Sequence, residues 1–132
     1  MASIHEAVGV VVVAVFAVGW LWGLGAWAAR RGPGRWFWTW LAVTQVLVVL
    51  QAVIGVVLFA MGRRADSWLH YAYGIFPVLV LVVAHVVARE TRTMKPSPRT
   101  GRTMEPWVPF AWAAFVCFGL TLRALMTGLG VA

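Results

Sequence analysis

Cysteine is nearly absent from this sequence, and the one that occurs, Cys117, stands in the middle of an apolar run. A single thiol cannot form a disulfide or a CxxC pair within the chain, which excludes dithiol chemistry such as thiol-dependent quinone reduction. We therefore interpret Cys117 as a small apolar packing residue.

Acidic residues are also scarce. The four are Glu6, Asp66, Glu90 and Glu105, and each lies near the end of an apolar run or between two runs. Small membrane exporters normally place a carboxylate near the middle of the bilayer to couple transport to protons, so this pattern argues against a transporter or channel. The HExxH motif of metallopeptidases is missing as well.

Apolar side chains are abundant: they make up 62% of the 132 residues and give a mean hydropathy of +0.85. A water-soluble domain of this size could not bury so much apolar surface, so the solvent is lipid. Four runs, at residues 7–29, 36–61, 68–88 and 107–129, reach the roughly 20 residues that cross a bilayer core. We predict one all-α domain over residues 1–132, an integral four-helix up-and-down bundle that is multi-pass in the plasma (inner) membrane.

The formal net charge of +7 is unevenly distributed along the chain. Eight of the eleven basic residues lie in or beside the first and third connections between runs, and three lie toward the other side, Arg63, Arg64 and Arg123. The positive-inside rule then predicts that the basic loop 89–106 is cytoplasmic and that both termini lie outside. Topology and contact with lipid head groups account for the charge, so nucleic acid is not an expected partner.

Two of the apolar runs open with a histidine that is followed four residues later by a glycine: His5 with Gly9, and His70 with Gly74. Residues i and i+4 stack on one face of a helix, so each glycine leaves a slot beside an imidazole in which a flat ring could lie. Small residues in membrane helices usually serve helix packing, but ionisable residues there usually have a function. Because the first and third helices of a bundle can face each other, we expect His5 and His70 to be the axial ligands of one haem b iron.

Other polar residues at the same level would complete such a site. Arg63 and Arg64 in the second connection, and Arg123 in the last helix, are candidates to bind the haem propionates. For Arg123 an acidic side chain or a lipid phosphate is the alternative partner. Gln51 lies one turn before Gly55, and it either contacts the ligand or bonds to a neighbouring helix.

The third histidine, His85, stands apart, because it lies 15 residues beyond His70, which is about 22 Å along a helix. A second bis-histidine haem is excluded, since no other histidine lies at that level. We interpret His85 as a hydrogen-bonded packing residue near a helix end. A five-coordinate or methionine-ligated haem, or a contact with quinone, is the alternative.

These motifs resemble one four-helix half of the haem A synthase family, whose members have eight helices in two such bundles. In that family a histidine with a glycine four residues on opens the first ligand helix, as at His5. A glutamine with a glycine four residues on follows in the next helix, as at Gln51, and a ligand histidine opens the one after, as at His70. The similarity covers about residues 4–85 and implies a bundle that holds haem b.

Two departures from the family limit what the resemblance implies. The glutamate that precedes the family's first ligand histidine is important for hydroxylation, and Ile4 stands in its place here. This sequence also has no counterpart of the family's second bundle. Oxidation of a farnesylated haem is therefore not implied.

We therefore expect a small b-type-cytochrome-like subunit that transfers electrons within a membrane redox complex. Its partners would be the lipid bilayer and other membrane subunits, with self-association left open and quinone as a second candidate ligand. The alternative is a cofactor-free accessory or structural subunit of a respiratory or photosynthetic complex. Both readings favour an electron-transfer or non-catalytic subunit over a stand-alone enzyme.

Overall fold

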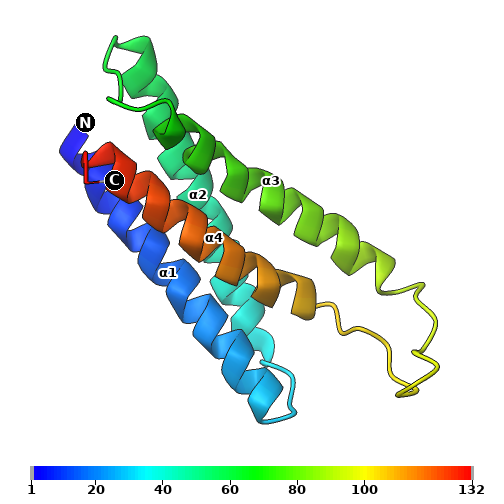
Figure 1. Cartoon of the computed structure of the whole chain (residues 1–132). Coiled ribbons are helices and arrows are strands. Elements are labelled where there is room, and N and C mark those ends of the chain that lie inside the picture. Colours follow the sequence, from blue (N-terminus) through cyan, green and yellow to red (C-terminus); the bar gives the residue numbers. More distant parts are fainter. Residues whose placement is uncertain (1, 132) are drawn as a thin grey trace.

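The computed structural model describes residues 2–131 and consists of four α-helices in an up-and-down arrangement (Figure 1). They are α1 (Ala2–Ala28), α2 (Arg35–Ala60), α3 (Leu69–Glu90) and α4 (Val108–Gly128). Each is long and apolar enough to cross a membrane, which makes the chain a multi-pass membrane protein and confirms the predicted all-α bundle.

The two ends of the bundle differ in character (Figure 1). One end holds both chain ends and the turn at residues 61–68, and we call it the histidine end because His5 and His70 lie there. The other end holds the connections at residues 29–34 and 91–107, and we call it the basic end.

The helix bounds agree with the predicted runs to within two residues except at the start of α1. That helix begins at Ala2 rather than at residue 7. We predicted a start at residue 7 because the uninterrupted apolar residues begin there. The helix also includes the residues before it, among them the polar Ser3, His5 and Glu6. His5 therefore lies on a helix, in its first turns.

A glycine turn ends α2 and leads the chain into the arginines of the histidine end. Gly62 has a φ of +81°, a conformation that glycine adopts without the steric cost of a Cβ. The turn is closed by the N–H of Arg63, which donates to the carbonyl of Leu58 at 3.0 Å, in the manner of a glycine-terminated helix.

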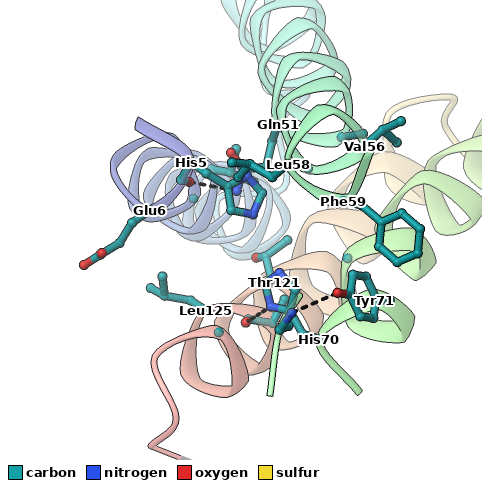
Figure 2. Close-up of a pocket in the computed structure, with 18 of the residues that line it drawn as sticks. His5, Glu6, Gln51, Val56, Leu58, Phe59, His70, Tyr71, Thr121 and Leu125 are labelled. Atoms are coloured by element: carbon teal, nitrogen blue, oxygen red, sulfur yellow. Dashed lines mark hydrogen bonds between the residues drawn. The ribbon is translucent and has the colours of Figure 1, made fainter. Parts of the chain in front are cut away.

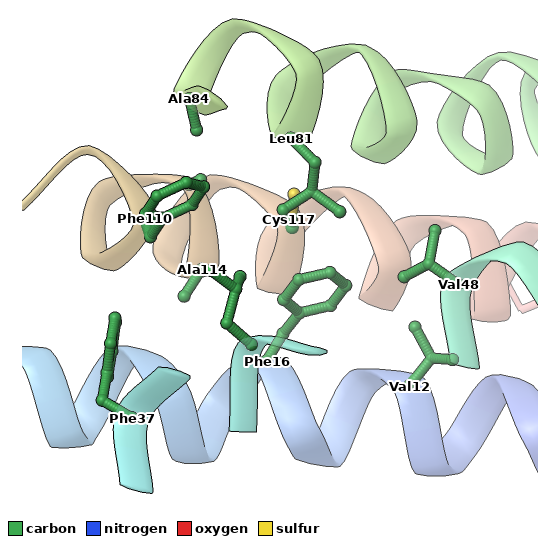
Figure 3. Packing of buried hydrophobic residues seen from close by; sticks show 11 residues of the cluster. Val12, Phe16, Phe37, Val48, Leu81, Ala84, Phe110, Ala114 and Cys117 are labelled. Carbon is green, nitrogen blue, oxygen red and sulfur yellow. The ribbon is translucent and has the colours of Figure 1, made fainter. Parts of the chain in front are cut away.

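The core runs along one stripe of each helix (Figure 3). Phe16 on α1 and Ala114 and Cys117 on α4 are fully buried near its middle. The thiol of Cys117 donates a weak hydrogen bond to the carbonyl of Pro77 at 3.6 Å, so this residue packs the core, as expected.

The helices are not equally close to one another. α1 packs against α2 and α4, and α4 packs against α3, but α2 and α3 meet at only a few places. The tightest approach is at Gly19, where an added Cβ would collide with the indole of Trp40; the Nε1–H of that indole donates to the carbonyl of Val15 at 2.8 Å. The line between α2 and α3, which we call the α2–α3 seam, is bridged by Gln45 with His85 and by Phe59 with Tyr71.

Candidate functional site

A cavity of about 650 Å³ lies at the histidine end and is lined by all four helices and the 61–68 turn. This volume is typical of pockets that hold small molecules and cofactors. Most of the residues predicted for the site line it, namely His5, Gly9, Gln51, Gly55, Arg63, Arg64, His70 and Gly74.

The two imidazoles of the site come from α1 and α3 and lie close together at this cavity, which both residues line (Figure 2). The ring centroids of His5 and His70 are 5.8 Å apart, and the ring planes make an angle of 68°. Residues 65 positions apart in the chain are thus brought together because α1 and α3 run in the same direction and both begin at the histidine end.

The orientation of His70 is fixed by α4. Its Nδ1 lies 2.8 Å from the carbonyl oxygen of Ala124, and because a carbonyl can only accept, Nδ1 carries the proton. Nε2 is then left with its lone pair, which is the form of histidine that binds a metal. The ring also lies against Gly128, where an added Cβ would come within 3.0 Å of it.

The position of His5 is set by Gln51. The Nε2–H of Gln51 donates to the backbone carbonyl of His5 at 3.0 Å, which ties the first turns of α1 to the middle of α2. Gly55 lets the imidazole approach α2, since a Cβ there would lie 3.3 Å from its Cε1.

Two buried polar atoms at this point have no hydrogen-bond partner among the described residues. They are Nδ1 of His5 and Oε1 of Gln51. A buried polar atom without a partner costs about 1–3 kcal/mol, so a native structure normally supplies one. A bound group or a water molecule close to these two atoms would therefore supply the missing hydrogen-bond partner.

The glycines that follow the two histidines have different surroundings. A Cβ at Gly74 would meet nothing within 4 Å, so there is open space beside this exposed residue. A Cβ at Gly9 would lie 3.1 Å from Nε2 of Gln51. Gly9 thus makes room for the glutamine side chain and leaves no slot, because α2 crosses α1 at this turn.

Of the three arginines predicted for the site, two lie at the cavity and one does not. Arg63 and Arg64 line its rim, and the guanidinium of Arg64 lies 3.6 Å from the ring centroid of Phe59. Arg123 is exposed, and its guanidinium lies 5.8 Å from the ring centroid of Tyr73. The α4 residues that line the cavity are spaced as one helix face, Thr121, Ala124, Leu125 and Gly128, and position 123 falls off that face.

His85 lies at the basic end and both of its ring nitrogens are engaged. Nδ1 donates to the carbonyl of Leu81 at 2.8 Å, and Nε2 accepts from the amide of Gln45 at 3.1 Å. No lone pair is left for a metal in this arrangement. The contacts favour the hydrogen-bonded packing residue over a ligand.

The contacts that α4 makes with His70, through Ala124 and Gly128, were not predicted from the sequence. A backbone carbonyl such as that of Ala124 has no signature in the sequence, but the pair Ala124 and Gly128 has the small-residue spacing that marks close helix approach. No family model, curated protein or solved structure matches the chain.

Proposed function

We propose that this chain is a small b-type-cytochrome-like membrane subunit that holds one haem b between His5 and His70 and transfers electrons within a membrane redox complex. The observation that carries the proposal is the pair of imidazoles that two helices bring to one cavity, with their ring centroids 5.8 Å apart. The resemblance to one half of the haem A synthase family supports the same reading.

The separation of the two rings is compatible with a shared iron. An imidazole nitrogen binds a metal at about 2.0–2.1 Å and lies about 1.1 Å from its ring centroid, so two imidazoles on opposite sides of one metal have centroids about 6.3 Å apart. The 5.8 Å between the centroids of His5 and His70 differs from this by about 0.5 Å, which small rotations about side-chain bonds can supply.

The tautomer of His70 suits ligation. The hydrogen bond from its Nδ1–H to the carbonyl of Ala124 directs the Nε2 lone pair and raises its basicity, as in most metal-bound histidines. His5 is held through its backbone by Gln51, so the ligand near the start of α1 is anchored to the bundle.

The rest of the cavity suits the periphery of a haem. Its lining is mostly apolar and includes Leu58 and Ile75, with open space beside Gly74. Arg63 and Arg64 at its rim would pair with the two propionates. A haem bound there would take up and release one electron at a time.

The orientation belongs to the same proposal. Eight of the eleven basic residues lie at the basic end or its connections, which supports a cytoplasmic position for that end of the bundle in the plasma membrane. The histidine end, with the proposed haem, would then face the outside.

A cofactor-free accessory subunit of a respiratory or photosynthetic complex is the second candidate, and one observation favours it. A centroid separation of 5.8 Å at a steep angle is also that of an ordinary edge-to-face ring pair, which needs nothing between the rings. The two candidates differ in whether the purified chain binds haem.

The experiment is a titration of the apoprotein in detergent with haem b, followed by visible absorbance. We expect saturation at one haem per chain and the spectrum of a six-coordinate low-spin haem. The variants His5→Ala and His70→Ala should lose this spectrum. His85→Ala should retain it, because both nitrogens of that ring are already bonded.

The same titration can refute the proposal. Binding that never saturates, or that is equal in the wild type and His70→Ala, would indicate non-specific partition of haem into the micelle. Binding that is lost only in His85→Ala would move the site to the basic end.

A further inference from the structure

A second hollow lies at the basic end, on the α2–α3 seam. It has a volume of about 290 Å³ and is lined by α2, the end of α3 and the start of α4. We call it the basic-end groove, and its chemistry is set by Trp38, Gln45, His85, Arg89, Arg92 and Phe110. It is separate from the histidine-end cavity, with which it shares no lining residue.

The groove carries positive charge. Arg89 lies in the last turn of α3, and Arg92 lies in the turn that follows, where its backbone N–H donates to the carbonyl of Arg89 at 3.3 Å. Both residues line the groove. The nearest acidic residues in the sequence, Glu90 and Glu105, do not line the groove. Guanidinium groups are suited to bind a phosphate through paired hydrogen bonds, and two arginines line this one groove.

The remainder of the groove is apolar and aromatic. The rings of Trp38 and Phe110 meet edge to face with centroids 5.8 Å apart, and Leu41 is buried beside them. Tryptophan at this position in a membrane helix marks the level of the lipid head groups. The groove therefore combines a charged rim with an apolar wall at the depth where a phospholipid changes from head group to acyl chain.

The hydrogen bonds of Gln45 and His85, two polar residues that line the groove, favour one class of ligand over another. Gln45 and His85 are bonded to each other across the seam, and the second nitrogen of His85 is bonded within α3. A quinone ring would need these groups as its hydrogen-bond partners, whereas a lipid phosphate needs only the arginines.

We propose that the basic-end groove is a binding site for an anionic phospholipid, with the phosphate on Arg89 and Arg92 and one acyl chain along the α2–α3 seam. Basic pockets between membrane helices bind anionic head groups in this way. The lipid would cover the line where α2 and α3 meet least and would join them at the basic end. This inference is independent of haem binding at the other end.

The test is native mass spectrometry of the full chain, released from detergent with phosphatidylglycerol or with zwitterionic phosphatidylcholine. We expect one phosphatidylglycerol to be retained in preference to phosphatidylcholine. The double variant Arg89→Gln/Arg92→Gln should bind it about 30-fold more weakly, because each basic side chain at an anionic lipid surface contributes about 1 kcal/mol. The matched control is Arg30→Gln/Arg31→Gln, which removes the same charge from the other connection at this end and should change affinity less than threefold.

A second variant separates a shaped site from a diffuse charge effect. Ala42 is an exposed residue of α2 that lines the groove, so Ala42→Phe fills the groove while all charges and the core stay in place. We expect it to lose lipid retention as well, with the helix content of the wild type.

Several results would overturn the proposal. The first two are an equal loss of phosphatidylglycerol affinity in the two arginine double variants, and full retention of the lipid by Ala42→Phe. The others are displacement of the lipid by millimolar inorganic phosphate as effectively as by added lipid, and retention of a quinone in place of the phospholipid. Each would show that the groove does not recognise a phospholipid as a whole.

Discussion

Substitution of Gly128 by alanine is expected to disturb His70, because the two residues are in contact. The added Cβ would lie 3.0 Å from both Cε1 and Nδ1 of the imidazole, whereas ordinary van der Waals contact begins at 3.4 Å. The ring must therefore move by about 0.4 Å, and its 2.8 Å hydrogen bond to the carbonyl of Ala124 must lengthen or bend.

The energetic effect can be worked out from these contacts. Gly128 is exposed and borders the cavity, and His70 is half-buried, so the ring has room to move. The main loss is then the weakened hydrogen bond, which costs up to about 1 kcal/mol. Alanine regains about 1 kcal/mol over glycine in a helix. Because these two effects oppose each other, we expect Gly128→Ala to change the free energy of unfolding in detergent by no more than about 1 kcal/mol.

Haem binding should suffer more than stability. Loss of the group that orients a metal-bound histidine typically lowers metal affinity about 10–100-fold. We expect a fall of about tenfold in the haem affinity of Gly128→Ala, measured by the absorbance titration, with a shift of the absorbance maximum.

The matched control is Gly119→Ala on the same helix. A Cβ there meets nothing within 4 Å, so stability should be unchanged or slightly raised and haem affinity unchanged. If Gly128→Ala behaves like Gly119→Ala in both measurements, then α4 does not orient His70 as described.

Three further predictions concern the packing around the two ends. Gln51→Leu should speed amide hydrogen exchange in residues 2–8 but not at the other end of α1, because the bond to His5 is lost; unchanged exchange would mean that this bond does not anchor the helix. Gly19→Ala should lower thermal stability by about 1–3 kcal/mol, since the Cβ collides with Trp40, and a wild-type melting curve would refute that contact. Gln45→Leu should lower the free energy of unfolding by no more than about 1 kcal/mol, because its bond to His85 is exposed. It should also leave haem binding intact, and a loss of haem would mean that the Gln45–His85 bond at the basic end affects the proposed site at the histidine end.

The fold could be predicted from the sequence because lipid imposes a simple rule. A run of about 20 apolar residues must become a helix, since no water is present to bond a free backbone. The face that α1 buries was also predictable, because Val12, Phe16 and Gly19 follow helical spacing and all three are buried. The start of α1 could not be predicted in this way, because polar residues near a membrane surface occur both in helices and in irregular segments.

The candidate site could be predicted only in part. His5 and His70 were expected to lie together because they open alternate helices of one bundle, and the structure does bring them together. The carbonyl of Ala124 was invisible, because every residue has one. The position of Arg123 depends on the rotation of α4 about its axis, which the sequence constrains weakly when lipid and protein both accept apolar faces.

The most direct test of the central proposal is a reduced-minus-oxidised visible spectrum of the chain purified from membranes without added haem. We expect the sharp bands of a low-spin b-type haem at one per chain, absent in His70→Ala and retained in His85→Ala. A colourless wild-type protein from haem-sufficient cells that co-purifies with respiratory subunits would contradict it and favour the cofactor-free accessory subunit.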